Sequence, residues 1–345
     1  MSNYLEIEGT VLEGVDYSVR ESLKSIIIPE GITEIGNYAF LGCKSLKNIS
    51  IPDSVKKIGN NAFDGCTSLQ NIIIPNRVIR IGEGAFCGCI SLQEIILPAG
   101  IWCIKDQTFS ECTSLQNIII PDSVETIGDW AFEKCHSLER VSIPNSITHI
   151  GKYAFYGCTS LQSVEIPGSI LTIREHTFDE CKNLKSVVIS EGTERIETSA
   201  FEACNSLESV SIPDTLSKIG DFAFYECPSL KSIEIEEEAV VGNNAFPEDT
   251  EVRLRKGDPA VKEARLKQKT ELEQKRIEQI KADKRKKRRQ RAYSVLFCLL
   301  ILSLCVCWYL FFVTDWAILW QVLWFLIIVP LIIAILTCII LVYII

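Results

Sequence analysis

Cysteine and histidine are the residues of this 345-residue chain with the richest chemistry, because thiolates and imidazoles bind metals and paired thiols form disulfides. The chain has fifteen cysteines and three histidines. Nine of the cysteines recur every 23 residues from Cys43 to Cys227, a regularity typical of a packing position filled by small buried side chains. Disulfides or a metal are the alternatives for these nine. Their even spacing favours free thiols in a reducing compartment.

The histidines and glycines show no recognised active-site pattern. His136, His149 and His176 lie in different repeats, and none has a second metal ligand at a recognised spacing. The glycine-rich segment 82–88 lacks the lysine and the following serine or threonine of a phosphate-binding loop. We therefore predict no catalytic residue, no metal and no cofactor. An enzyme would need a triad assembled in space, and a cleft with converging ionisable groups would be its first sign.

The elements that position these residues form an array of one repeated unit. Phenylalanine recurs every 23 residues from Phe40 to Phe224, with a cysteine three positions after each and a leucine three positions further on. The unit reads L-x-x-I-x-I-P-x-x-V-x-x-I-G-x-x-A-F-x-x-C-x-S, as in residues 46–68. A period of this length indicates a solenoid, in which each coil is stable only when it is stacked on its neighbours.

Within one unit the pattern predicts a short strand followed by turns. Apolar residues alternate up to Ile51, and Pro52 ends the strand because it cannot donate a backbone hydrogen bond. Gly59 permits a turn or a close backbone approach. We expect Phe63 and Cys66 to fill the wall opposite the strand.

The signature I-P-x-x-V-x-x-I-G-x-x-A-F-x-x-C-x-x-L resembles the BspA-type leucine-rich repeat family, and it occurs nine times across about residues 23–246. The resemblance implies an α/β-type solenoid, a curved right-handed leucine-rich repeat coil with a parallel β-sheet on its concave side. It also implies protein binding and no catalytic residues. Residues 1–22 then form an N-terminal cap, and residues 23–256 form the solenoid with a C-terminal cap, for which residues 252–254 are the expected last strand.

The departures from the signature are local, and we expect them to change mainly the turns. They are Ser190 in place of proline, Lys105, Arg174 and Glu197 in place of glycine, and Thr108 and Thr177 in place of alanine.

The variable strand positions are the candidate binding residues, because the alternate positions point into the core. Ile73, Ile96 and Ile119 occupy the same outward position in three consecutive repeats, and they are bordered by the amides of Gln70, Gln93 and Gln116. An exposed apolar patch with a polar rim indicates a protein contact on the concave face. The alternative is that these β-branched residues only stabilise strand pairing.

Charge divides the chain into unlike parts. Residues 1–256 carry 21 Lys and Arg against 37 Asp and Glu, whereas residues 257–291 carry 14 against 6. The acidic array argues against a nucleic-acid partner, which requires clustered basic residues.

Residues 257–291 are predicted to form a basic, charged helical spacer, with Asp258 as its cap and Pro259 in the first turn. A coiled-coil dimer is the alternative for this helix. The cluster of basic residues at its end favours contact with anionic lipid headgroups over a nuclear-localisation signal. These lipid-contact candidates are Lys281, Lys284, Arg285, Lys286, Lys287, Arg288, Arg289 and Arg291.

Residues 292–345 are predicted to form a transmembrane hairpin, with spans at 292–313 and 316–345 and Asp315 in the turn between them. The positive-inside rule keeps the basic cluster, and with it the repeats, on the cytoplasmic side. The absence of a signal peptide in residues 1–15 agrees with this orientation.

These features together predict a non-enzymatic, membrane-anchored scaffold or tether that faces the cytosol and captures a protein. The identity of the membrane is left open, as is a homo-oligomer through the helix or the hairpin. The alternative is a surface adhesin or receptor-like protein with its repeats outside the cell, which requires the positive-inside rule to fail.

Overall fold

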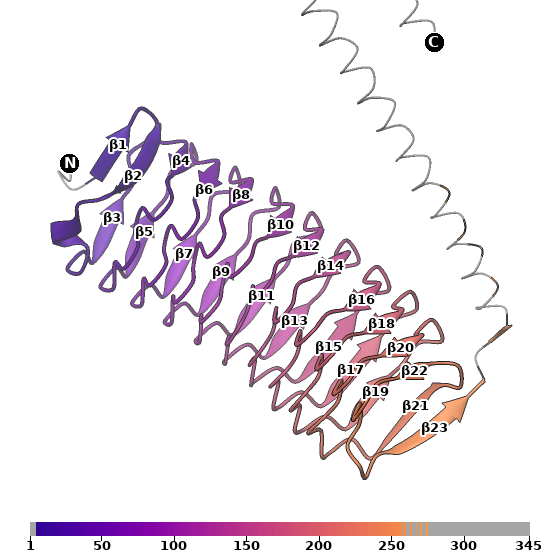
Figure 1. The fold of residues 1–345 in the computed structure, drawn as a ribbon. Helices are drawn as coiled ribbons and strands as arrows, with labels where there is room; N and C mark the ends of the chain where they lie inside the picture. Colours follow the sequence, from indigo (N-terminus) through magenta and orange to yellow (C-terminus); the bar gives the residue numbers. More distant parts are fainter. Residues whose placement is uncertain are drawn as a thin grey trace, which may run out of the picture. The chain divides into compact units, whose positions relative to one another are not determined.

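The computed structural model describes residues 5–256, together with residues 258, 259, 263, 267, 270 and 274. Figure 1 shows residues 5–256 as a stack of flat coils, in which the odd-numbered strands from β3 onward line up along one side and the short even-numbered strands line up along another. The predicted parallel-sheet solenoid is therefore confirmed. The predicted charged helix falls mostly, and the transmembrane hairpin entirely, outside the described residues.

The odd-numbered strands are parallel and follow one another in chain order, each shifted by one repeat. They are hydrogen-bonded as a pair (β3 and β5), a seven-stranded sheet (β7 to β19) and a second pair (β21 and β23). Within each strand the side chains alternate, so that Ile72 and Ile74 are buried while Ile73 points outward. Their bounds are β3 Ser25–Ile27, β5 Asn48–Ser50, β7 Asn71–Ile73, β9 Glu94–Ile96, β11 Asn117–Ile119, β13 Arg140–Ser142, β15 Ser163–Ile166, β17 Ser186–Ile189, β19 Ser209–Ser211, β21 Ser232–Glu236 and β23 Glu251–Arg255.

The even-numbered strands are two residues long from β4 onward, and each ends on the apolar residue that precedes the repeat's glycine position. Their bounds are β4 Glu34–Ile35, β6 Lys57–Ile58, β8 Arg80–Ile81, β10 Cys103–Ile104, β12 Thr126–Ile127, β14 His149–Ile150, β16 Thr172–Ile173, β18 Arg195–Ile196, β20 Lys218–Ile219 and β22 Val240–Val241. This second sheet is broken twice, between β8 and β10 and between β14 and β16.

The glycine that follows most of the even-numbered strands lets consecutive coils approach closely. A Cβ atom on Gly82 would lie 2.4 Å from the backbone nitrogen of Asn60 in the preceding coil, closer than real Cβ contacts. The N–H of Gly82 donates to the carbonyl of Ile58 at 2.9 Å. This bond links the two coils beside strands β6 and β8.

The two breaks coincide with the two coils that carry a double departure from the signature. Lys105 and Arg174 replace the glycine after β10 and β16, and a threonine replaces the alanine three residues later in each coil. The hydroxyl of Thr108 donates to the carbonyl of Lys105 at 2.8 Å, and Thr177 makes the equivalent bond to Arg174 at 2.9 Å. Loss of the glycine alone does not break the sheet. Glu197 also replaces glycine, and its N–H still donates to the carbonyl of Ile173 at 2.8 Å. The departures thus alter strand pairing as well as turns.

The segment that follows the even-numbered strand in each coil is built from turns rather than a helix. In residues 5–256 the one helical element is the short 3-10 helix η1, Tyr17–Val19, so the α part of the predicted fold class is absent from the described solenoid. The reason is a left-handed residue just before the alanine of the repeat, with φ of 51° at Asn61 and 54° at Trp130. Such a residue interrupts a right-handed helix. The backbone instead bonds from coil to coil, as Phe63 N–H does to the carbonyl of Ala85 at 2.8 Å.

The repeated phenylalanines form one continuous stack in the core. Phe40 to Phe224 are fully buried, and consecutive rings lie 5.1–5.6 Å apart between centroids with nearly parallel planes. Phe246 continues the stack at 5.6 Å from Phe224. Identical side chains of successive coils thus lie directly above one another, as the period predicts.

The repeated cysteines line the same core as free, buried thiols. Most donate to a phenylalanine carbonyl of the preceding coil, as Cys112 Sγ does to Phe86 O at 3.1 Å. A weak thiol donor of small volume therefore fits a position where a larger or strongly polar side chain would not. Cys87 and Cys103 are outside this column and are half-buried.

Both ends of the described array carry atypical elements. The hairpin of β1, Leu5–Glu8, and β2, Val11–Val15, is antiparallel, and β2 then pairs in parallel with β4. At the other end β23 pairs in parallel with β21, which confirms the expected strand at residues 252–254. The guanidinium of Arg255 forms an ion pair with Asp214 at 2.8 Å.

Candidate protein-binding surface

The first candidate site is an apolar column on the outer face of strands β7, β9 and β11, which we call the isoleucine stripe (Ile73, Ile96 and Ile119). The three residues are in register across the parallel strands, and their side chains are 84%, 70% and 76% exposed. The geometry that the sequence predicts for these residues is therefore present.

The three predicted rim residues also come together. Gln70, Gln93 and Gln116 are exposed at the starts of the same three strands, and their backbones are joined by hydrogen bonds, from Gln93 N–H to the carbonyl of Gln70 at 3.0 Å and from Gln116 N–H to that of Gln93 at 3.2 Å. An amide column thus borders the isoleucine stripe.

The isoleucine stripe ends abruptly on both sides. The equivalent outward residue is Ser50 in β5 and Ser142 in β13. Within the stripe's own strands, Glu94 is the single charged residue. The patch is therefore apolar and amide-rich, on an array whose residues 1–256 are strongly acidic.

Exposed apolar side chains extend beyond the stripe on the same coils, which the sequence reasoning missed. Ile79 and Trp102 are more than half exposed and occupy the same repeat position, just before strands β8 and β10. The sequence could have indicated that these two side chains are exposed, since the same repeat position holds the charged residue Glu125 in the next coil.

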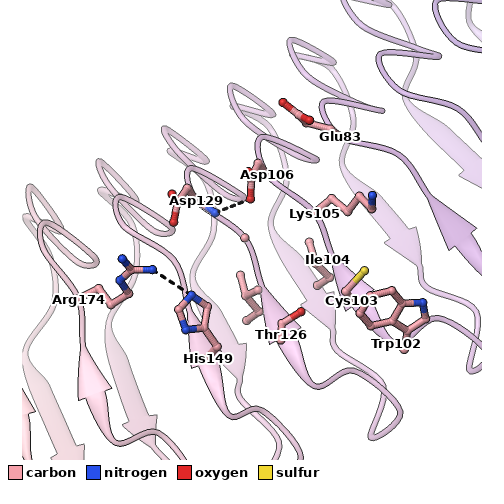
Figure 2. Close-up of a pocket in the computed structure, with 12 residues that line it drawn as sticks. Glu83, Trp102, Cys103, Ile104, Lys105, Asp106, Thr126, Asp129, His149 and Arg174 are labelled. Carbon is pink, nitrogen blue, oxygen red and sulfur yellow. Dashed lines mark hydrogen bonds between the residues drawn. The ribbon is translucent and has the colours of Figure 1, made fainter. Parts of the chain in front are cut away.

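The second candidate site is a shallow hollow of about 430 Å³ on the outer face of β10, β12 and β14. Figure 2 shows Trp102 and Cys103 at one end and His149 and Arg174 at the other. The hollow lies between the two breaks in the even-numbered sheet, with Lys105 from the first and Arg174 from the second among its lining residues. Each double departure thus contributes a basic side chain to its lining.

Several ionisable groups of the hollow are engaged in structural contacts. Arg174 Nη1 donates to His149 Nε2 at 3.1 Å, and burial together with the guanidinium lowers the pKa of His149. Asp106 Oδ1 accepts from the N–H of Asp129 at 2.9 Å. Burial raises the pKa of the Cys103 thiol, so it is a poor nucleophile near neutral pH. These contacts do not assemble a nucleophile with a general base.

A third group is a side-chain cluster that the sequence analysis did not find. His176 Nδ1 and Asp179 Oδ2 are 2.9 Å apart, and the ligand atoms of His176, Asp179 and Glu202 all lie within 4.8 Å of one another. Asp179 and Glu202 occupy the same repeat position in consecutive coils, and that relation was the available signal. The other two histidines do not join this cluster.

The predicted lipid-contact residues, from Lys281 to Arg291, and both predicted membrane spans lie outside the described residues. In the part of the chain that the structure describes, no helix combines the length and the hydrophobicity needed to cross a bilayer.

A solenoid with a short parallel strand in each 23-residue repeat is the architecture of leucine-rich repeat proteins. The family model described as "BspA type Leucine rich repeat region (6 copies)" matches residues 17–139 and 125–253. The chain therefore belongs to the BspA-type leucine-rich repeat family.

Solved structures of repeat proteins resemble the chain in part. A leucine-rich cell surface protein from Faecalibacterium prausnitzii is 28% identical, with 70% of this chain and 81% of that chain covered and a TM-score of 0.47. A leucine-rich repeat protein of T. pallidum is also 28% identical, over 60% of this chain and 89% of that chain, with a TM-score of 0.42. The pneumococcal vaccine antigen PcpA is 22% identical over 68% of this chain and 69% of that chain, with a TM-score of 0.44. No curated protein matches the chain.

Proposed function

We propose that this protein is a non-enzymatic scaffold that captures a protein partner on the solvent-facing side of its odd-numbered strands, the side that the leucine-rich repeat resemblance makes concave, centred on the isoleucine stripe. The observation that carries the proposal is the register of Ile73, Ile96 and Ile119, which places three exposed isoleucines side by side. Exposed apolar patches of this kind are typical of protein contacts.

Strand pairing alone is a weaker explanation of the stripe. β15 and β17 pair over four residues, with Glu165 opposite Val188 at the outward position, and β17 pairs with β19 with Val188 opposite Ser211. These strands pair over at least as many residues as β7 and β9, which pair over three. Isoleucine is therefore not required at this position for a parallel ladder, and the stripe needs a further reason.

The partner we propose has an apolar segment flanked by basic side chains. Apolar side chains would cover the isoleucines, and basic groups would suit an array with 37 Asp and Glu against 21 Lys and Arg in residues 1–256. Binding to such a partner should weaken as salt rises, because added ions screen the attraction between exposed charges.

The test is site-specific photocrosslinking in cells from position 93 of the full-length chain, next to the stripe. Ile96→Lys should weaken capture of the crosslinked partner about tenfold, equivalent to about 1.4 kcal/mol, because a charge replaces apolar contact and repels basic groups. Val188→Lys is the matched control, since Val188 is exposed at the same strand position three coils further on than Ile119. Equal capture by wild type and Ile96→Lys would remove the stripe as the site.

We also propose that residues 292–345 anchor the protein as a membrane hairpin, with the repeats in the cytosol. The apolar stretches 292–313 and 316–345 are long enough to span a bilayer, and the basic residues before them would contact anionic headgroups with about 1 kcal/mol for each charge. The column of free thiols in the repeats is consistent with a reducing compartment.

Protease added to intact cells tests this orientation. Cytosolic repeats should survive until the membrane is permeabilised, whereas a surface adhesin would lose its repeats at once. Extraction with alkaline carbonate tests the anchor separately, because a peripheral protein is released and a spanning one is retained. The two outcomes are independent of the crosslinking result.

A further inference from the structure

The cluster of His176, Asp179 and Glu202 shares no residue with the isoleucine stripe or with the lining of the hollow. His176 and Asp179 lie in the turn segment after β16, and Glu202 lies in the equivalent segment after β18. Among the residues that the structure describes, this is the one group of three metal-ligating side chains whose ligand atoms lie within 4.8 Å of one another.

The repeat holds this cluster in a rigid frame. Asp179 follows Phe178 and Glu202 follows Phe201, and these two rings stack at 5.4 Å with their planes 5° apart. The N–H of Glu180 donates to the carbonyl of Glu202 at 2.9 Å, so the backbones that carry the two carboxylates are also joined. Asp179 and Glu202 are thus held as neighbours in a column by the core beneath them.

Two carboxylates in one column are costly without a compensating cation, because like charges in adjacent coils repel and burial disfavours the ionised form. Asp179 is only 8% exposed, and the carboxylate of Glu202 lies beside it in the next coil. The fold therefore holds a buried carboxylate next to a second one.

Nearby lysines do not remove this cost. Lys152 pairs with Glu175 at 2.8 Å and Lys182 pairs with Glu180 at 3.4 Å. In residues 5–256, no lysine or arginine forms an ion pair with Asp179 or Glu202, and His176 is the one basic partner of Asp179. The cluster therefore offers two carboxylates and one imidazole, and no lysine or arginine of the described residues is paired with either carboxylate.

We propose that His176, Asp179 and Glu202 bind one divalent transition-metal ion of the zinc class. One imidazole nitrogen with two carboxylate oxygens is a ligand set that Zn²⁺ accepts, with a water in the fourth position. Ca²⁺ and Mg²⁺ prefer oxygen ligands alone, so the histidine sets the selectivity. The preceding coil cannot form the same site, because the positions of His176 and Asp179 are held there by Tyr153 and Tyr156.

The test is equilibrium dialysis of the full-length chain against Zn²⁺ in excess Mg²⁺, with bound zinc measured per chain by mass spectrometry. The site variants are Glu202→Gln and His176→Asn. Asparagine is chosen because His176 has a φ of 55°, a left-handed conformation that asparagine tolerates. The matched controls are Glu133→Gln, at the same repeat position as Glu202, and His136→Asn, at an exposed histidine.

Cysteines elsewhere in the chain can also bind zinc, so the informative quantity is the difference between variants. Wild type and both controls should hold one more zinc per chain than the two site variants, whose affinity should fall at least tenfold. Equal zinc content in Glu202→Gln and Glu133→Gln would overturn the proposal, as would displacement of the ion by equimolar Ca²⁺. If His176→Asn fails to fold by circular dichroism, Glu202→Gln decides, because Glu202 is half-buried and outside the core.

Discussion

Truncation of one phenylalanine in the middle of the stack is the sharpest test of the core. Phe109 is fully buried and stacks on Phe86 at 5.6 Å and on Phe132 at 5.4 Å. Phe109→Ala removes both ring contacts and leaves a cavity in a packed interior, and such changes cost about 3–5 kcal/mol. Each ring pair contributes about 0.5–1.5 kcal/mol of that sum. We therefore expect a loss near the upper end, about 4–5 kcal/mol.

The matched control is Phe246→Ala at the end of the same stack. Phe246 is half-buried and has one ring neighbour, Phe224 at 5.6 Å. Losing one ring pair and about half of a buried aromatic surface should cost about 1–2 kcal/mol. The ratio of the stability losses of the two variants, rather than either loss alone, measures the contribution of ring stacking.

Hydrogen exchange of the full-length chain, read by mass spectrometry, measures both losses and locates them. In a one-dimensional array the loss of protection in Phe109→Ala should be largest in the coils of Phe86, Phe109 and Phe132 and should decrease with distance. A cost for Phe246→Ala equal to that for Phe109→Ala would refute the reasoning, because it would mean that ring neighbours on both sides add nothing.

Further predictions concern the contacts between coils and the exposed groups. Gly82→Ala should destabilise the array by about 1–3 kcal/mol in urea denaturation, because the new methyl group meets the backbone of the preceding coil. An unchanged denaturation midpoint would show that the coils are farther apart than in the structure. Burial and Arg174 lower the pKa of His149 in the folded protein. The neutral imidazole therefore stabilises the folded state at pH values above the unfolded pKa of His149, and this stabilisation is lost as the pH falls through its folded pKa. Wild type should therefore lose more stability than His149→Gln between pH 7 and pH 5, and parallel losses would contradict the assignment. Iodoacetamide should label the half-buried Cys87 and Cys103 of the native protein, slowly because burial raises both pKa values, while the nine thiols of the repeat column stay unlabelled until the protein unfolds. Labelling of the column at the same rate would show that the core is open.

Much of this structure follows from a single number, the 23-residue period. Because the period fixes which side chains stack, the buried phenylalanine column and the outward register of Ile73, Ile96 and Ile119 could be predicted without coordinates. Strand alternation then decided which of Ile72 and Ile73 was exposed. These predictions depend on local pattern and on the repeat alone.

The breaks in the even-numbered sheet depend on distances between coils and could not be predicted in this way. Lys105, Arg174 and Glu197 make the same departure from glycine, yet the coil of Glu197 keeps its bond to the carbonyl of Ile173. The difference lies in the threonine that accompanies the first two, and in how each turn meets the coil before it. The hollow in Figure 2 lies between these breaks, so it too could not be predicted from the sequence.

The His176 cluster illustrates a different limit of sequence reading. Recognised metal motifs are short spacings on one helix or loop, whereas here the spacing is three residues and then one full repeat. A solenoid turns a full repeat into a direct contact, so candidate sites must be sought along columns as well as along the chain.

The size of the isoleucine stripe limits the interface that it can form. Three neighbouring strands about 4.8 Å apart span about 10 Å, whereas a stable protein contact buries about 800 Å² on each partner. Three isoleucines are therefore the centre of a contact and not the whole of it. The surface that can complete it lies on the same coils, in the amide column from Gln70 to Gln116. A partner that covers the stripe must therefore also satisfy these amides, which restricts it to a segment with both apolar and hydrogen-bonding groups.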